Sequence, residues 1–296
     1  MPFTLSHAAA VLPAVRGDGT GRGRLVPAVL VAGSFSPDLT YYAASAVPDA
    51  MEFGAFTHSF TGVFTVDVLF SWALVALWVL VREPLVALLP RTRQGRLAAL
   101  LRCGAPRARA GLSVTARWYV SAVLGALTHV VWDAFTHHDR WGTRLIPAIG
   151  RHVAGVPLYT LLQYGTSAVA AAVLGVFVLR ALRRAPAGEP VGAPLLSAGD
   201  RWWAGAGIAG CALLAAVQQA TRFTELRRVA APARVVAGDG RAYWGSTAKP
   251  WELLPTVLFG AGAGLLLGVL GYAVAVRVWR PAPVADGVRR SPSAVR

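Results

Sequence analysis

Five apolar runs of about 20 residues constrain the fold of this chain more than any other feature of its sequence. They cover roughly residues 59–81, 117–136, 157–180, 202–220 and 253–279. A helix of about 20 residues crosses the ~30 Å hydrocarbon core of a bilayer, and backbone polar groups at that depth must be satisfied within the segment. We therefore expect an all-α, polytopic integral membrane helix bundle with about five full transmembrane helices.

Two shorter apolar pieces precede these runs, at about 3–15 and 25–36. Each is marginal for crossing a bilayer alone. We expect either a re-entrant hairpin or two short, partly buried helices. Residues 1–280 are interpreted as one membrane domain, and the Pro- and Arg-rich tail 281–296 is typical of disorder.

The composition supports a membrane protein over a nucleic-acid-binding one. Charged residues make up 15% of the chain, against about 25% in a typical soluble domain. The net charge of +15 could by itself indicate a nucleic-acid partner. Basic residues on a membrane protein usually mark cytoplasmic loops instead, so we expect the lipid bilayer as partner and no nucleic acid.

The positions of the basic residues predict the orientation. Of the 29 Lys and Arg residues, 20 fall in one set of alternating segments, at 16–24, 82–117, 180–201 and 277–296. The other set, 140–151 and 222–249, holds the remaining 9. The richer set should be cytoplasmic. This places the chain in the inner or plasma membrane, with the N-terminus outside and the C-terminus in the cytoplasm.

All six histidines lie in the first 152 residues, where the alternating path would bring several of them to one side of the membrane. His7 begins the first apolar piece, Asp38 follows the second, and His58 begins the first full span. The second full span carries further His and Asp residues toward the same side. Imidazole nitrogens and carboxylate oxygens are standard ligands for zinc and similar divalent ions. The pattern predicts a metal site within residues 1–152, with 153–280 as accessory helices.

The stretch LTHVVWDAFTHHD, residues 127–139, is the most informative segment. His129 and Asp133 are four residues apart, so a helix places both on one face and can offer two ligands to one ion. His137 lies two such steps on, about 80° round the helix from His129. His138 faces the opposite direction if the helix continues.

A structural role is the alternative for each of these residues. A single buried histidine is more often hydrogen-bonded than metal-bound. A charged residue such as Asp133 near the bilayer centre costs roughly 2.5–3.5 kcal/mol, so it needs a partner, which could be His129, an arginine, water or a metal. The convergence of four His/Asp segments favours a metal. Asp67, nine residues into the first span, is expected to face away from His58 and to pack between helices.

Other chemistries find little support. The segment GAGAGLLLG at 260–268 has the small-residue spacing of a helix-packing face and not of a nucleotide-binding loop. Cys103 and Cys211 lie in a basic loop and an apolar span, so we expect neither a disulfide nor a thiolate metal site.

Four motifs carry a resemblance: MPFTLSHAAAVLP, GSFSPDL, FTHSFTGVFTVD and LTHVVWDAFTHHDRWG. Together they resemble an uncharacterised membrane family that is frequent in actinobacteria and carries only a domain-of-unknown-function label. Their order also resembles that of inner-membrane metal-dependent hydrolases. More distantly, it is similar to zinc-dependent phospholipase C and P1-type nucleases, which hold zinc clusters in helical folds and cleave phosphate esters.

The resemblance implies six metal ligands and zinc as the ion. They are His7, Asp38, His58, His129, Asp133 and His137. The chain departs from the nuclease pattern because no second HxxxE follows the HxxxD, since Val156 stands four residues after His152. We therefore expect one or two ions and not three.

The resulting hypothesis is a membrane-embedded metal-dependent hydrolase acting on a phosphoester or lipid-linked substrate. Asp38 or Asp133 would serve as a ligand or as the general base. Two alternatives remain, a non-catalytic protein with a structural His/Asp or metal network, and a small transporter that uses Asp67 and Asp133 as intramembrane charges. The lack of obvious inverted repeats counts against the transporter.

Overall fold

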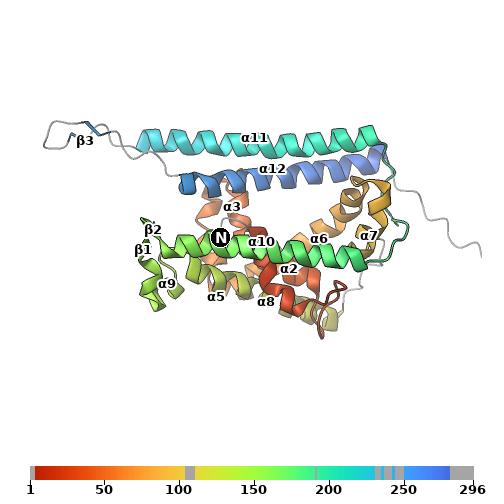
Figure 1. Ribbon diagram of the computed structural model, residues 1–296, viewed down its shortest axis with the longest axis horizontal. Helices are drawn as coiled ribbons and strands as arrows, with labels where there is room; N and C mark the ends of the chain where they lie inside the picture. The colour runs from red at the N-terminus through yellow and green to blue at the C-terminus, as the bar shows by residue number, and fades with distance from the viewer. Residues whose placement is uncertain are drawn as a thin grey trace, which may run out of the picture.

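The computed structural model describes residues 4–103, 111–190, 192–230, 235–236, 242–243 and 250–280. The helices are α1 (Ala8–Val11), α2 (Pro27–Phe35), α3 (Leu39–Ala43), α4 (Gly54–Thr57), α5 (Phe60–Phe64), α6 (Val66–Ala87), α7 (Arg91–Leu101), α8 (Leu112–Thr136), α9 (Trp141–Leu145), α10 (Leu158–Arg184), α11 (Ala198–Ala230) and α12 (Pro250–Trp279) (Figure 1). Two antiparallel hairpins pair β1 (His152–Val153) with β2 (Val156–Pro157) and β3 (Val235–Val236) with β4 (Ala242–Tyr243). The all-α prediction is confirmed, whereas the predicted disordered tail lies outside the described residues.

Within the described residues, four helices are long and apolar enough to cross a bilayer. They are α6, α10, the Ala198–Glu225 part of α11 and the Leu253–Trp279 part of α12. In the last two, only 6% and 11% of the most apolar 18-residue stretch is buried inside the protein. Large side chains such as Leu214 and Trp203 face outward. Apolar helices turned outward are typical of a chain solvated by lipid. The chain is therefore a multi-pass membrane protein.

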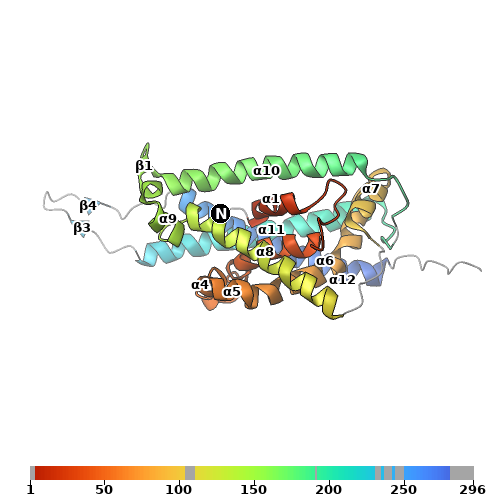
Figure 2. The same ribbon diagram turned by 90° about the horizontal axis from the view of Figure 1, so that it is seen from below.

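The spans run along the long axis of the molecule. Figure 1 shows α11 and α12 as a hairpin that covers the other helices, and Figure 2 shows α10 along another side. α8 corresponds to the expected span 117–136 and is 25 residues long, but it is not one of the four helices that are apolar enough to cross a bilayer. Its sequence carries Arg117, His129 and Asp133, and it packs inside the bundle against α2 and α6.

The predicted span 59–81 is not one helix. α5 ends at Phe64, and Thr65 adopts φ −126° and ψ −91°, so that α6 starts at Val66. Gly62 in α5 lies directly against the backbone of α4, since a Cβ there would be 2.2 Å from the Phe56 carbonyl oxygen. With this break, α5 packs against α6 and α8, and α4 packs against the turn that carries Asp38, which brings His58 toward that turn.

The two N-terminal apolar pieces form short buried helices. Residues Thr4–His7 make a 3₁₀ turn that leads into α1. α2 begins at Pro27, and the Ser121 hydroxyl of α8 accepts a hydrogen bond from the N–H of Val26, at 3.0 Å. With 9 residues, α2 is about 13 Å long and too short to cross a bilayer. It packs against α6 and α8, inside the bundle.

α2 and α8 cross at a pair of glycines. A Cβ on Gly125 would lie 2.2 Å from the carbonyl oxygen of Leu30, and one on Gly33 would lie 2.5 Å from that of Ala122. Neither position has room for a side chain, so the two backbones touch. This contact places the end of α2, with Ser34, beside the His129 turn of α8.

The α11–α12 hairpin closes in a similar way. Cβ atoms on Gly260 and Gly264 would collide with the backbone of α11 at Ala215 and Cys211, and one on Gly268 would lie 3.1 Å from Cα of Ile208. The segment 260–268 is thus a helix-packing face, as its spacing predicts. Both cysteines are free.

Replacing Gly125 with alanine should lower the stability of the protein by roughly 1–3 kcal/mol, because the new methyl group overlaps the Leu30 carbonyl. Thermal unfolding of the purified protein in detergent measures this loss. Gly271→Ala in α12 is the matched control, since nothing lies within 4 Å of a Cβ there. Equal unfolding midpoints for the two variants would show that the α2–α8 crossing tolerates a side chain.

Candidate metal centre

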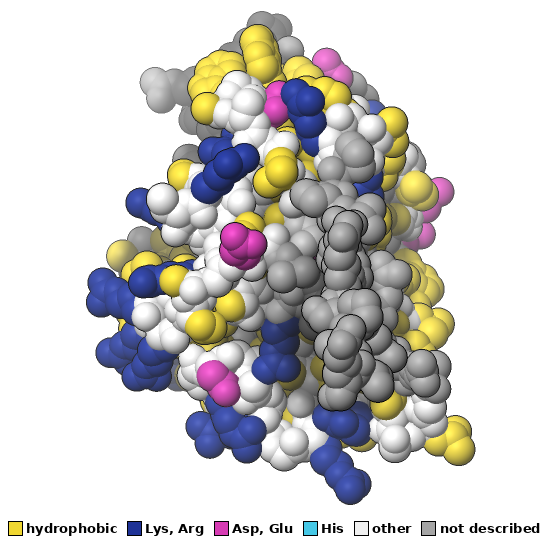
Figure 3. Space-filling model, turned by 90° about the vertical axis from the view of Figure 1, so that its right-hand side faces the viewer, with side chains coloured by type: hydrophobic (Ala, Val, Ile, Leu, Met, Phe, Trp, Pro, Cys, Tyr) yellow, Lys and Arg dark blue, Asp and Glu magenta, His cyan; other side chains and the backbone are white. Residues whose placement is uncertain are grey.

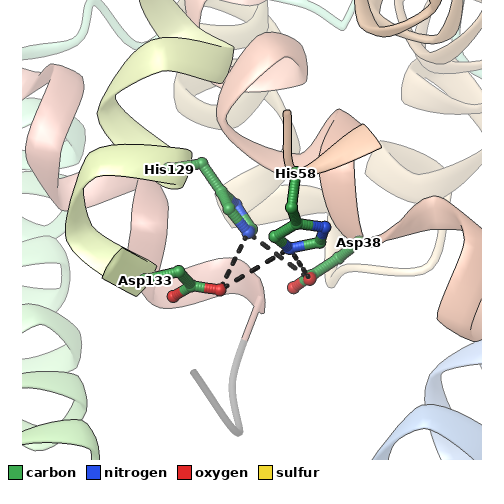
Figure 4. Close-up of side chains that lie close together, drawn as sticks. All are labelled: Asp38, His58, His129 and Asp133. Atoms are coloured by element: carbon green, nitrogen blue, oxygen red, sulfur yellow. Dashed lines mark ion pairs between the residues drawn. The ribbon is translucent and has the colours of Figure 1, made fainter. Parts of the chain in front are cut away.

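Four side chains from separate elements meet inside the bundle (Figure 4). Asp38 ends the 3₁₀ turn that follows α2, His58 follows α4, and His129 and Asp133 lie one turn apart on α8. All four are buried, and one ligand atom from each lies within 4.8 Å of the others. A single cation among them would be in reach of two imidazoles and two carboxylates.

Backbone carbonyls orient both imidazoles. His129 Nδ1 lies 2.7 Å from the carbonyl oxygen of Ser34, and His58 Nδ1 lies 2.9 Å from that of Gly54. Because a carbonyl only accepts, each Nδ1 carries a proton and each Nε2 is directed at the carboxylates. Metal-bound histidines are usually supported by this kind of bond from the other ring nitrogen.

The distances within the cluster are those of neighbouring ligands. His129 Nε2 is 3.4 Å from both Asp38 Oδ1 and Asp133 Oδ2, and His58 Nε2 is 3.5 Å and 3.6 Å from the same two atoms. These separations exceed the 2.7–3.2 Å typical of N–H···O hydrogen bonds. Two ligands at about 2.0–2.1 Å from a tetrahedral zinc ion are about 3.3 Å apart. The geometry therefore fits four ligands of one ion better than direct His–Asp hydrogen bonds.

Asp133 presents its second oxygen to another histidine. Oδ1 lies 3.4 Å from His7 Nε2, and the His7 ring stacks on His129 with centroids 3.6 Å apart. His7 is fully buried, and neither ring nitrogen has a hydrogen-bond partner within the described part of the chain. A buried polar atom without a partner costs about 1–3 kcal/mol. A cation between His7 and Asp133 would offset that cost.

His137 lies beside Asp133, as the sequence predicts, but it reaches this position from an extended segment and not from a helix. α8 ends at Thr136, where the predicted span 117–136 also ends. His137 is extended, with φ −126° and ψ 152°, so the helical position assumed for it, about 80° round from His129, does not apply. Its Nδ1 lies 3.5 Å from Asp133 Oδ1, and the amide nitrogen of Gln163 lies 2.9 Å from its Nε2. With this amide donating, the ring proton sits on Nδ1 and faces Asp133. The 3.5 Å separation is longer than an ordinary N–H···O hydrogen bond, and the implied role of His137 as a metal ligand stays a prediction.

Two threonines support the cluster from behind. The Thr4 hydroxyl donates to Asp38 Oδ2 at 2.5 Å, which leaves Oδ1 for the histidines. The Thr57 hydroxyl donates to the Pro37 carbonyl at 2.7 Å and so ties α4 to the turn that holds Asp38. These bonds fix carboxylate and imidazole orientations before any ion binds.

Protonation follows from burial and from the neighbouring charges. Burial alone would raise the pKa of Asp38, but His129 and His58 outweigh it and hold this pKa well below its usual value. Burial lowers the pKa of His58, yet Asp133 and Asp38 raise it above the usual value on balance. Burial and the neighbouring His129 push the pKa of His7 far down, so His7 is neutral and its lone pair can bind a cation.

The remaining polar candidates lie outside the cluster. Asp67 is fully buried at the start of α6, and neither carboxylate oxygen has a hydrogen-bond partner among the described residues. The break at Thr65 separates its helix from His58, so the predicted opposite faces of one helix do not apply. The His138 ring packs edge-on against Tyr159, and His152 is exposed in β1.

A cavity of about 200 Å³ opens beside the cluster. It is lined by His58, Val130, Asp133, Ala134, Asp139, Arg140, Trp141 and Arg144. Asp133 and His58 thus belong both to the cluster and to the cavity wall. A small molecule in the cavity would touch the ligands of the proposed ion.

Sequence reasoning missed several parts of this centre. Thr4 stands three residues before His7, a spacing that could have suggested a shared face. Gln163 and the carbonyls of Ser34 and Gly54 leave no such signal, because a main-chain acceptor carries no sequence signature and α10 meets α8 only in the folded bundle.

Comparison with known proteins assigns the chain to a family but gives no chemistry for this centre. No curated protein and no solved structure matches the chain. One family model does match, over residues 1–274, which include every residue of the cluster. This confirms the expected membership of an uncharacterised family, while the hydrolase resemblance stays a prediction. The chain belongs to the family described as Domain of unknown function (DUF4184).

Proposed function

We propose that this protein is a membrane-embedded metal-dependent hydrolase that acts on a phosphoester, with zinc as the ion. The observation that carries the proposal is the pair of imidazoles whose Nδ1 atoms are bound to backbone carbonyls while their Nε2 atoms face two carboxylates at 3.4–3.6 Å. Four buried donors at ligand-to-ligand spacing beside a cavity form a metal centre with open access.

Each residue has a proposed role. Asp38, His58, His129 and Asp133 would hold the ion, which supplies Lewis-acid polarisation and lowers the pKa of a water toward 7. Asp133 lines the cavity and Asp38 does not, so Asp133 is the better placed of the two to accept a proton from that water. His137 would steady Asp133 through Nδ1, and His7 with Asp133 Oδ1 offers the position for a second ion.

We also propose the orientation that the basic residues predict. The arginine-rich segments meet at one end of the bundle, where Arg16, α7 and the end of α10 with Arg184 lie together. Figure 3 views this end and shows Lys and Arg side chains in dark blue over much of it. The cluster of Asp38, His58, His129 and Asp133 lies toward the other end, where α9 lines the cavity beside it (Figure 1). An arginine-rich end in the cytoplasm would put the cluster on the outer side.

Purified protein should carry about one or two equivalents of zinc per chain, and His129→Ala should fall below about 0.2 equivalents, because it removes a central ligand. Elemental analysis by mass spectrometry gives these numbers. His138→Ala is the matched control, since this neighbouring ring packs on Tyr159 outside the cluster. Full zinc in His129→Ala would exclude the metal centre.

Activity separates the hydrolase from a structural metal site. The zinc-loaded protein should hydrolyse members of a phosphodiester and phospholipid panel, and Asp133→Asn should reduce turnover by about 100-fold or more. Zinc content is measured on the same samples. Stoichiometric zinc without turnover of any panel member would favour a metal that only holds the helices together.

Cysteine labelling tests the orientation. In a Cys103→Ser, Cys211→Ser background, a membrane-impermeant maleimide applied to intact cells should label Arg151→Cys and spare Arg93→Cys. Both positions are exposed and lie at opposite ends of the bundle, beside β1 and in α7 (Figure 1). Labelling of Arg93→Cys alone would invert the orientation, and equal labelling would contradict the alternating path.

A further inference from the structure

The cavity beside the cluster contains two arginines with different electrostatic surroundings. Arg144 is neutralised by Asp139, whose Oδ1 lies 3.0 Å from both Nε and Nη2. Arg140 has no carboxylate within ion-pair distance among the described residues, although it lines the same cavity as His58 and Asp133. Among the described residues, Arg140 is therefore the cavity arginine that has no ion-pair partner.

The fold holds Arg140 at this position. Asp139 adopts φ 57°, a left-handed conformation that Asp tolerates better than most residues, and it reverses the chain after α8. α9 then packs onto α8 through Gly142, where a Cβ would lie 2.6 Å from the Ala134 carbonyl oxygen. Arg140 is the residue that precedes α9, so the turn and the glycine contact together set it at the cavity wall.

The charges around the cavity indicate that its ligand is an anion. Two carboxylates and one divalent ion are neutral together, so Arg140 leaves the loaded site with a net positive charge beside the cavity. A planar guanidinium and a metal ion can each bind an oxygen of the same phosphoryl group.

On the basis of the proposed function, we infer that Arg140 is the residue that binds the substrate's phosphoryl group, so that the substrate is an anionic phosphoester held between this guanidinium and the metal. A volume of about 200 Å³ accommodates a phosphate with a small headgroup and leaves no space for two acyl chains. Trp141 borders the cavity and contacts Phe135 and Phe60, which gives the rest of a lipid an apolar route outward.

Equilibrium binding of inorganic phosphate to the zinc-loaded protein in nanodiscs tests this inference. Arg140→Gln should weaken binding at least about 10-fold with unchanged zinc content, and Arg140→Lys should fall between that variant and the natural chain, because it keeps the charge but loses the fork. Arg151→Gln, an exposed arginine of the same loop region, should change binding less than about twofold. Phosphate binding that is equal in Arg140→Gln and the natural chain, or absent from the natural chain, overturns the inference.

Two further arms identify the source of the phosphate and separate this inference from the proposed function. The first arm compares a short-chain phosphatidic acid with inorganic phosphate. If the lipid binds at least about 10-fold tighter, and Arg140→Gln weakens both ligands, the site takes a lipid headgroup. Equal affinities assign the site to a free phosphate compound. The zinc-free protein serves as the second arm. Phosphate binding that depends on Arg140 with or without zinc would support the anion site even if the hydrolase proposal failed.

Discussion

Two carboxylates, Asp38 and Asp133, lie buried against the same pair of imidazoles, and the rest of the described structure is arranged to make this possible. A buried carboxylate is costly unless it is paired, and two of them close together repel each other. His58 and His129 lie within 3.6 Å of both. The glycine crossing of α2 and α8 and the break before α6 bring these residues together from four parts of the chain.

The apolar surroundings make each of these polar contacts count more. In a low-dielectric interior the hydroxyl of Thr4 and the carbonyls of Ser34 and Gly54 hold their partners more strongly than they would in water. Nε2 of His7 and Nε2 of His129 have no hydrogen-bond partner among the described residues, and each lies 3.4 Å from an oxygen of Asp133. The space beside Asp133 is where the proposed ion would lie, so the unmet bonding capacity and the ligand geometry point to the same place.

The sequence predicted which residues meet in the candidate site better than it predicted the backbone geometry that brings them together. Parity of membrane crossings and the i,i+4 spacing of His129 and Asp133 bring Asp38, His58, His129 and Asp133 to one side of a bundle, and the structure places them in one cluster. The same reasoning assumed one continuous helix for 59–81 and helical spacing between His129 and His137. Both assumptions were wrong, because the backbone conformations at Thr65 and His137 end these helices and hydropathy does not register such local breaks.

The sequence by itself determined the helical membrane architecture, the small-residue packing face at 260–268 and the identity of the polar residues that approach one side, because hydrophobic length and helical period are local properties. Only the tertiary structure decided how those residues are used. It directs Nε2 of His58 and His129 toward the carboxylates, because each Nδ1 is bound to a backbone carbonyl, and it turns Nδ1 of His137 toward Asp133. Among the described residues it also leaves Arg140 at the cavity without a carboxylate within ion-pair distance, whereas Arg144 is paired with Asp139. These outcomes depend on the meeting of α2, α4, α8 and α9 in space, which no single segment encodes.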